Sequence, residues 1–466
     1  MDYLYLFFMI LKMGFLVAWI YALLRVLDLK AWWQKLLGLL ACFGVIQLLF
    51  SLQFGEFQIF SAFDQGLVYQ AVTMAMIALG LNLIYGFNGQ FSLAQWGFYG
   101  VGAYCSADIT WRWMNGDARG LIVVGVGVIL TGVLYFIVAR LLARKRGVPV
   151  LSAFTFYVLA TVAAGFVAVM AGKWLAPAFT GLLGTVAAPG LLNGTLGRYA
   201  VFTISVLFAG AFAAEMSFLV GLPILTLGSD YFGIATLGFS IVLQTLMINS
   251  DTILPFPEMK GGRGMIGVPK LINQDTWAFA FIFLVAIIAI MRNLIRSSTG
   301  RTVMAVREDE VASKAMGVDV AGTKLLAFVV GSLFAGVGGA IYAHWAGFLS
   351  PNTFSFLKGF DPLIIVVFGG LGSITGTLAA SFGWIFFLEG FLRVLLGKLG
   401  TEAPTWRFVL YPITLLLVML LRPQGLLGSV EWGFVKARRA RRVPPTGSAP
   451  PTGGEPAATE PAKGGS

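Results

Sequence analysis

The sequence predicts an all-α polytopic membrane protein with about 10–13 transmembrane helices, some of them interrupted or re-entrant. Hydrophobic residues make up 58% of the 466 residues and charged residues only 11%, whereas soluble globular chains carry about 25% charged residues. The mean hydropathy is +0.86, and the charges gather between long apolar runs. A soluble core cannot use so many apolar side chains, so the bilayer is the expected solvent.

The apolar runs define the candidate spans, each of which needs roughly 20 residues to cross the hydrocarbon layer. They lie at 3–24, 36–54, 66–86, 91–110, 120–139, 148–171, 199–222, 231–249, 276–291, 325–346, 362–373, 374–396 and 407–421. The run 362–373 is too short for a full crossing, and 231–249 carries several polar residues. We therefore expect interrupted segments among the spans.

Loop charge orients the chain. Lys and Arg cluster at 25–35, 140–146 and 292–324, and such loops remain on the cytoplasmic side. The connection 55–65 has no Lys or Arg, which fits the outer side. We expect a periplasmic N-terminus and a cytoplasmic C-terminus. The net charge of +11 then reports topology and contact with anionic lipid, and no nucleic-acid partner is expected.

A cluster of polar side chains lies in otherwise apolar sequence between Ala78 and Tyr104. Its members are Asn82, Asn88, Gln90, Ser92 and Gln95. Hydrocarbon offers no partner to amide and hydroxyl groups, so such a cluster must be buried in protein or face a wet passage. We interpret these five residues as a candidate substrate pathway.

Small residues predict a packed helix and two helix breaks. Small side chains recur every four residues within 332–347 and allow neighbouring backbones to approach. The four residues that we assign to helix packing are Gly336, Gly339, Ala340 and Ala343. Gly86 and Gly89 flank Asn88 where one span ends, and FGGLGSITG at 368–376 marks a second break. Two interrupted segments point to a translocation site near the midplane.

The segment 297–324 is the most informative polar stretch. Its charges alternate in sign, and Gly317 is well placed to end a helix. Apolar residues recur near helical spacing, at Val303, Val306, Val311, Ala315 and Met316. We expect short helices on the cytosolic face, which serve either as a solvated connector or as a docking site for another subunit.

Nothing in the sequence indicates an enzyme. The two cysteines lie in apolar runs and there is a single histidine, His344, so neither a metal site, a disulfide framework nor a catalytic residue is predicted. The run GGLGSITG lacks the lysine of a phosphate-binding loop. We expect His344 to be a satisfied structural histidine.

Ionisable residues within spans suggest a rival function. Glu215, Glu389 and Asp108 could relay protons in an ion-coupled secondary transporter. Alternatively, Glu389 pairs with Arg393 and Asp108 lies close to Arg112, while Glu215 lies near the inner end of its span. A non-transporting scaffold would explain neither the interrupted spans nor the polar cluster.

Five blocks follow one another along residues 66–428. They are GLNLIYGFNGQFSLAQWGFYGVGAY; DYFGIATLGFSIVLQTLMIN with GGRGMIGVP; STGRTVMAVREDEVASKAMGVDV with KLLAFVVGSLFAGVGGAIYAHWAGFLSPNTFSF; FGGLGSITG; and RPQGLLG. Together they resemble the LivM-type permease subunit of the bacterial branched-chain amino acid ABC importers. The chain departs from the family pattern at Ala94-Gln95, where Gly-His is common, and in longer sequence at 1–65 and around 140–200.

The resemblance implies a domain organisation. Residues 66–428 would form the ABC permease transmembrane domain with an atypical insertion around 140–200, and 1–65 would add N-terminal spans. The segment 297–324 would be the cytosolic coupling loop, followed at 429–466 by a basic tail that its composition predicts to be cytosolic and disordered. The residues that would couple to the ATPase are Arg301, Arg307, Glu308, Asp309, Glu310 and Gly317.

The resemblance also implies partners and a substrate. A LivH-like second permease, two ATP-binding cassette subunits and a periplasmic substrate-binding protein would assemble with this chain in the bacterial inner membrane. ATP and Mg would bind to the cassette subunits, and this chain would hold no cofactor. The expected cargo is branched-chain (aliphatic) amino acids moving into the cytoplasm, although permeases of this family also serve urea and short amides.

Overall fold

The computed structural model describes residues 2–54, 57–144, 149–185, 190–192, 194–225, 229–253, 258–270 and 273–397, and single positions between 409 and 431. The run 407–421 and the predicted tail lie largely outside these residues. Residues Met1–Val435 form one compact unit, to which the following description applies.

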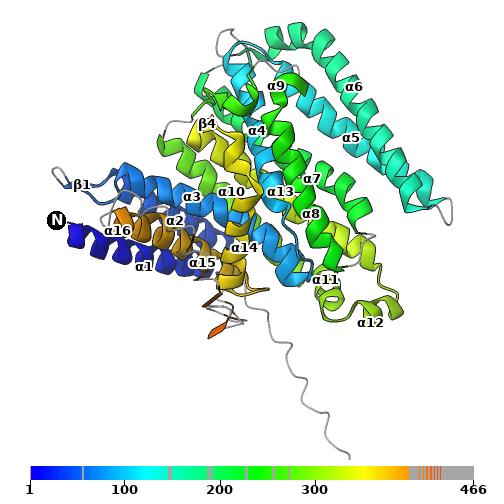
Figure 1. The fold of residues 1–466 in the computed structure, drawn as a ribbon. Helices are drawn as coiled ribbons and strands as arrows, with labels where there is room; N and C mark the ends of the chain where they lie inside the picture. The colour runs from blue at the N-terminus through cyan, green and yellow to red at the C-terminus, as the bar shows by residue number, and fades with distance from the viewer. Residues whose placement is uncertain are drawn as a thin grey trace, which may run out of the picture. The chain divides into compact units, whose positions relative to one another are not determined.

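Long helices dominate the described residues (Figure 1). They are α1 (Asp2–Leu27), α2 (Trp32–Ser51), α3 (Ala62–Leu81), α4 (Gln95–Met114), α5 (Arg119–Ala143), α6 (Val150–Leu183), α7 (Gly194–Ile224), α8 (Ser229–Ile248), α10 (Asn273–Arg296), α13 (Val320–Ala346) and α15 (Ile374–Ile385). Ten helical segments in this part of the chain are long and apolar enough to cross a membrane. The predicted all-α polytopic architecture is confirmed.

Short elements connect the long helices. They are α9 (Ser250–Ile253), α11 (Ser298–Glu308), α12 (Glu310–Ala315), α14 (Phe360–Gly369), α16 (Arg393–Gly397), the π-helical turns η1 (Asn82–Phe87) and η5 (Phe386–Leu392), and the 3₁₀ turns η2 (Gly261–Arg263), η3 (Pro351–Phe354) and η4 (Phe356–Gly359). Two antiparallel ribbons pair β1 (Gln53–Phe54) with β2 (Phe57–Gln58) and β3 (Met265–Ile266) with β4 (Phe348–Leu349). In the second ribbon, Met265 is opposite Leu349.

The central helix is α13, which packs against α3, α4 and α7 (Figure 1). Small residues make this contact close. A Cβ on Gly336 would approach the Ala213 Cβ of α7 to 2.6 Å, and one on Gly339 would collide with the Tyr99 carbonyl of α4. Ala340 is fully buried. Backbone-to-backbone packing of this kind is how helices associate where hydrocarbon gives no hydrophobic driving force.

Ala343 and His344 of α13 are also buried. Ala343 is fully buried, and His344 is 1% exposed. The His344 Nδ1 lies 3.0 Å from the Ala340 carbonyl oxygen, whereas Nε2 has no hydrogen-bond partner in the described part of the chain. The expectation of a satisfied histidine therefore holds for only one ring nitrogen.

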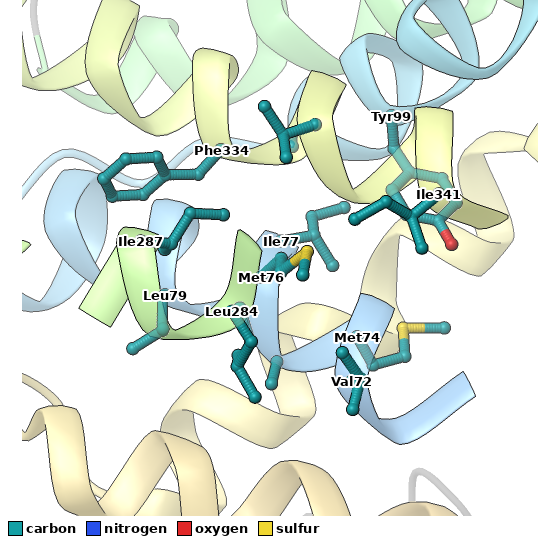
Figure 2. Close-up of a cluster of buried hydrophobic side chains, with 14 of the residues drawn as sticks. Val72, Met74, Met76, Ile77, Leu79, Tyr99, Leu284, Ile287, Phe334 and Ile341 are labelled. Carbon is teal, nitrogen blue, oxygen red and sulfur yellow. The ribbon is translucent and has the colours of Figure 1, made fainter. Parts of the chain in front are cut away.

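Helix α3 is enclosed by protein, as 94% of the residues in its most apolar stretch are buried. Figure 2 shows Met76 and Ile77 of α3 beside Leu284 and Ile287 of α10 and Phe334 of α13. All five side chains are at most 3% exposed. Because protein rather than lipid surrounds α3, polar groups at its end can be satisfied by neighbouring helices.

Both predicted helix breaks are present. Helix α3 ends in η1, and residues 88–94 are non-helical before α4 begins at Gln95, four residues later than the predicted run 91–110. The short run 362–373 corresponds to α14 and a turn before α15. Positive φ angles of 77° at Gly89, 115° at Gly370 and 79° at Gly372 explain why glycine stands at these turns.

An ion pair fixes the N-terminal helices to the remainder of the unit. Lys12, which interrupts the apolar run of α1, donates from Nζ to Asp64 Oδ2 at 2.7 Å. The Asp64 side chain is 0% exposed and also accepts from the Ser61 backbone N–H at 3.0 Å, forming a capping box at the start of α3. The lysine within the first span is thus neutralised by a carboxylate on another helix.

We expect Lys12→Leu to destabilise the protein by about 3 kcal/mol, because it leaves a buried carboxylate without its counter-ion. The thermal unfolding midpoint in detergent should fall, and Lys12→Arg should restore most of the loss. The exposed Lys30 provides the control, since Lys30→Leu should leave the midpoint unchanged. Equal midpoints for Lys12→Leu and the unaltered protein would show that this pair does not hold α1 in place.

Candidate functional site

The two helix breaks meet at Asn82. Its Nδ2 donates to the Ser373 carbonyl and to Thr377 Oγ1, both at 2.9 Å, and its Oδ1 accepts from the Gly372 backbone N–H at 2.9 Å. Asn82 is fully buried. Its polar atoms join the end of α3 to the break before α15, so the geometry favours a positioning role over direct contact with substrate.

Arg307 of α11 contacts the place where the two helix breaks meet, which we call the joint. Its Nη1 donates to the Gly86 carbonyl in η1. Its side chain also lies against the second break, because a Cβ on Gly372 would come within 3.0 Å of Nη1. A Cβ on Gly86 would overlap Asn82 Oδ1, so this position requires glycine. The Arg307 guanidinium on α11 therefore lies against both helix breaks.

The region 297–324 folds into α11 and α12, as the pattern predicts. Asp309 caps α12 by accepting from the Val311 N–H at 2.8 Å, and Glu310 pairs with Lys324 at the start of α13. Gly317 follows α12 with φ of 82°. Asp309 and Glu310 therefore have structural partners within the chain.

The remaining predicted coupling residues and two apolar side chains face outward. Arg301 and Glu308 are exposed. Val311 is 80% exposed and Met316 84% exposed, whereas the helical spacing had grouped them with the buried Val303. The sequence pattern missed this exposed apolar pair because α11 ends at Glu308 and a new helix starts in a different direction.

The polar cluster retains unpaired atoms. Asn88 Nδ2 donates to Gln90 Oε1 at 2.7 Å, and Ser92 Oγ accepts from the Ala94 N–H at 3.4 Å. Gln95 Nε2 donates to Ser332 Oγ of α13 at 3.2 Å. Asn88, Gln90, Ser92 and Gln95 are all at most 6% exposed. The structure thus places these four residues together at the start of α4.

Three of the buried polar atoms in this region have no hydrogen-bond partner among the described residues: Asn88 Oδ1, Gln95 Oε1 and Ser240 Oγ of α8. Leaving a buried polar group unsatisfied costs about 1–3 kcal/mol. Unsatisfied polar groups in a native protein call for an explanation. Polar residues inside membrane proteins are often found along solute pathways, and this is the explanation that we test below. Sequence reasoning did not include Ser240 in the cluster.

Glu431 contacts the second helix break at the start of α15. Glu431 accepts hydrogen bonds from the backbone N–H groups of Ile374 at 2.9 Å and Thr375 at 3.2 Å. Burial raises the pKa of the Glu431 carboxyl, while these hydrogen bonds oppose the shift. The carboxylate satisfies the N-terminal end of α15. Glu431 thus has defined contacts, although it belongs to the predicted tail 429–466.

Two of the three residues that suggested a proton relay, Asp108 and Glu389, have ion-pair partners, whereas no ion pair of Glu215 is found among the described residues. Arg112 Nε binds Asp108 at 3.0 Å and its Nη2 binds Glu258 at 2.6 Å. Arg393 lies 3.8 Å from Glu389. Glu215 lies about 13 Å before the end of α7 at 1.5 Å per residue, farther from the helix end than expected from sequence. The described residues contain no group of His, Cys, Asp and Glu that could hold a metal.

The chain is similar to permease components of branched-chain amino acid transport systems. Residues 65–181 and 146–419 match the family described as "Branched-chain amino acid transport system / permease component". The high-affinity branched-chain amino acid transport system permease protein LivM of Escherichia coli is 31% identical over 248 residues, which are 47% of this chain and 56% of LivM. The Pseudomonas aeruginosa permease protein BraD is 28% identical over 256 residues, 53% of this chain and 80% of BraD.

A second type of permease is also similar. The permease protein LivH of Escherichia coli is 26% identical over 208 residues, 42% of this chain and 64% of LivH. The chain therefore spans somewhat more than half the length of LivM and LivH. No solved structure matches significantly. The family match covers most of the helical unit, and the chain belongs to the permease components of branched-chain amino acid transport systems.

Proposed function

We propose that this chain is one permease subunit of an ATP-driven importer that moves branched-chain (aliphatic) amino acids into the bacterial cytoplasm. It would lie in the inner membrane with its N-terminus in the periplasm and its C-terminus in the cytoplasm. The observation that carries the proposal is the contact of Arg307 with Gly86, because it joins the coupling helices to the break beside the polar cluster. The printed names of LivM and BraD supply the substrate class.

The proposed partners are those that the family resemblance implies. A LivH-like permease would complete the pore, and two ATP-binding cassette subunits would bind ATP and Mg. A periplasmic binding protein would deliver the substrate. Val311 of α12 and Met316, which follows this helix, are exposed apolar side chains that suit docking of a cassette subunit, since charged residues are depleted at the centre of an interface.

The mechanism uses Arg307 as a mechanical link. Closure of the cassette subunits on ATP would displace α11 and α12. Because Arg307 donates to the Gly86 carbonyl, movement of α11 would shift η1 and the non-helical residues 88–94. Asn82 holds the second break to the same point, so both breaks would move together. The pathway would then change from outward-open to inward-open.

Substrate contacts would be weak and neutral. An amino acid gives up the hydration of its charged ends only if dipoles replace it. The amides of Asn88, Gln90 and Gln95 and the hydroxyl of Ser92 can supply such dipoles without holding the substrate tightly. Affinity would reside in the external binding protein.

Two alternatives have specific support. A pathway of amides and hydroxyls suits urea or short amides as well as amino acids. Glu215 has no ion pair among the described residues, which would suit an ion-coupled transporter. Reconstituted complex in vesicles distinguishes these functions: leucine uptake should require ATP, and uptake driven by a pH difference without nucleotide would refute the importer.

We expect Arg307→Ala to lower ATP-driven leucine uptake about tenfold, because a loss of roughly 1.4 kcal/mol in the coupled step has that effect. Arg307→Lys should retain part of the activity, since it keeps the charge but loses the planar donor group. Co-purification of the cassette subunits should be unchanged. Full uptake in Arg307→Ala would remove Arg307 from the mechanism.

We expect Val311→Asp and Met316→Asp to release the cassette subunits, because each substitution places a charge in an apolar contact. Uptake should be lost while membrane insertion and helix content stay normal. Gln58→Asp, an exposed position in the β1–β2 ribbon, is the matched control and should co-purify with all subunits. If both the Val311 and the Met316 variant retained the cassette subunits, the docking surface would lie elsewhere.

We expect Gln95→Leu to reduce uptake about tenfold without affecting assembly, because the substrate loses a dipole at the site where its charges are dehydrated. Ser106→Ala is the control on the same helix: it removes a buried hydroxyl that pairs with Ser205 at 3.0 Å, outside the polar cluster. If both variants transport equally well, Gln95 does not line the pathway.

A further inference from the structure

Helices α5 and α6 run side by side along one edge of the unit (Figure 1) and enclose a cavity against α4, α7 and α8. Its volume is about 660 Å³, which lies within the usual range for ligand sites. The wall is mainly aliphatic, with Val124 and Val128 from α5 and Leu243 from α8. This cavity is separate from the polar cluster of the proposed pathway.

The hairpin of α5 and α6 faces lipid on its outer side. Ile129 and Phe136 of α5 are 61% and 58% exposed, and Leu159 and Phe166 of α6 are both 64% exposed. A large exposed apolar face of this kind indicates contact with an apolar medium rather than water, and lipid tails provide such a medium. The cavity behind this face therefore lies at the depth of the lipid tails, and lipid is the medium that can enter it.

One end of the cavity carries cations. Lys173 lines it beside Gly172, whose added Cβ would meet Val123 of α5. Lys173 is exposed and has no ion pair among the described residues. Arg119 lines the same end and is 58% exposed, with Asp117 at 3.7 Å. An unpaired ammonium next to an apolar channel complements a phosphate group.

Buried polar groups mark other parts of the wall. The Ser250 hydroxyl is 2% exposed and has no partner in the described part of the chain. Glu215 lines the far end, where Tyr135 and Thr161 share a hydrogen bond of 2.8 Å. From Gly120 to Tyr135 the cavity follows α5 for about 22 Å at 1.5 Å per residue. One bilayer leaflet is about 15 Å thick, so this length accommodates a lipid tail.

We propose that the cavity binds one acyl chain of an anionic phospholipid, with its phosphate at Lys173 and the chain ending before Glu215. The aliphatic wall accounts for the tail, and the unpaired cation at the open end accounts for the headgroup. The bound lipid fills the space between the α5–α6 hairpin and the other helices. The bound lipid gives the α5–α6 hairpin a role that does not depend on transport.

Gly165→Leu tests occupancy, since Gly165 lines the cavity and an added Cβ meets no atom within 4 Å. Delipidated protein in detergent is titrated with phosphatidylglycerol, and retained lipid is counted by native mass spectrometry. We expect about tenfold weaker retention in Gly165→Leu. Gly14→Leu, at an equally open position on α1 outside the cavity, should retain lipid normally. Unchanged retention in Gly165→Leu overturns the proposal.

Substitution of Lys173 tests the headgroup without altering the packed interior. Lys173→Gln should abolish the preference for phosphatidylglycerol over phosphatidylcholine, and Lys173→Arg should preserve it. Glu215→Gln should leave retention unchanged, because the tail ends before this side chain. If Glu215→Gln releases the lipid while Lys173→Gln does not, the occupant enters with a cationic head at Glu215 and the proposal is wrong.

Discussion

Irregular backbone at membrane depth must find its hydrogen bonds within the protein, and the contacts of Asn82 meet this constraint. Hydrocarbon cannot satisfy the peptide groups freed where α3 and α14 end. The Asn82 side-chain amide accepts a hydrogen bond from the Gly372 N–H and donates one to the Ser373 carbonyl. The Glu431 carboxylate accepts hydrogen bonds from the first N–H groups of α15. Enclosure of α3 by other helices keeps these bonds out of lipid. Backbone groups at both breaks are thus satisfied from within the protein.

The same constraint explains why Arg307 is suited to transmit motion. Carbonyls near the end of a helix lack their usual intrahelical partners, and Arg307 supplies a donor to Gly86 from a separate element. If α11 moved while η1 stayed in place, the carbonyl of the buried Gly86 would lose that donor. The energy of an unsatisfied buried acceptor, about 1–3 kcal/mol, therefore favours movement of the two elements together.

Local patterns in the sequence predicted the spans, the two breaks and the short helices of 297–324, because apolar runs and glycines act over a few neighbouring residues. The pairing of Glu389 with Arg393 could also be predicted from the sequence, since it depends only on helical spacing. Contacts between distant segments were not. Lys12 meets Asp64 across 52 positions and Asn82 meets Ser373 across 291. No periodicity encodes such distances, so the sequence predicts Asn82 as part of the candidate pathway but does not predict its contacts with the second break.

In the proposed pathway, the unpaired atoms near the start of α4 would limit how tightly a solute is held. Asn88 Oδ1, Gln95 Oε1 and Ser240 Oγ are acceptors that a passing ammonium or amide can satisfy. Each contact recovers only the cost of one unsatisfied neutral group, and none of the three carries a full charge that would retain the solute. A shift of residues 88–94 through Arg307 would change which acceptors are reachable. Weak neutral sites next to a movable segment permit release as readily as entry, which is what a conducting gate requires.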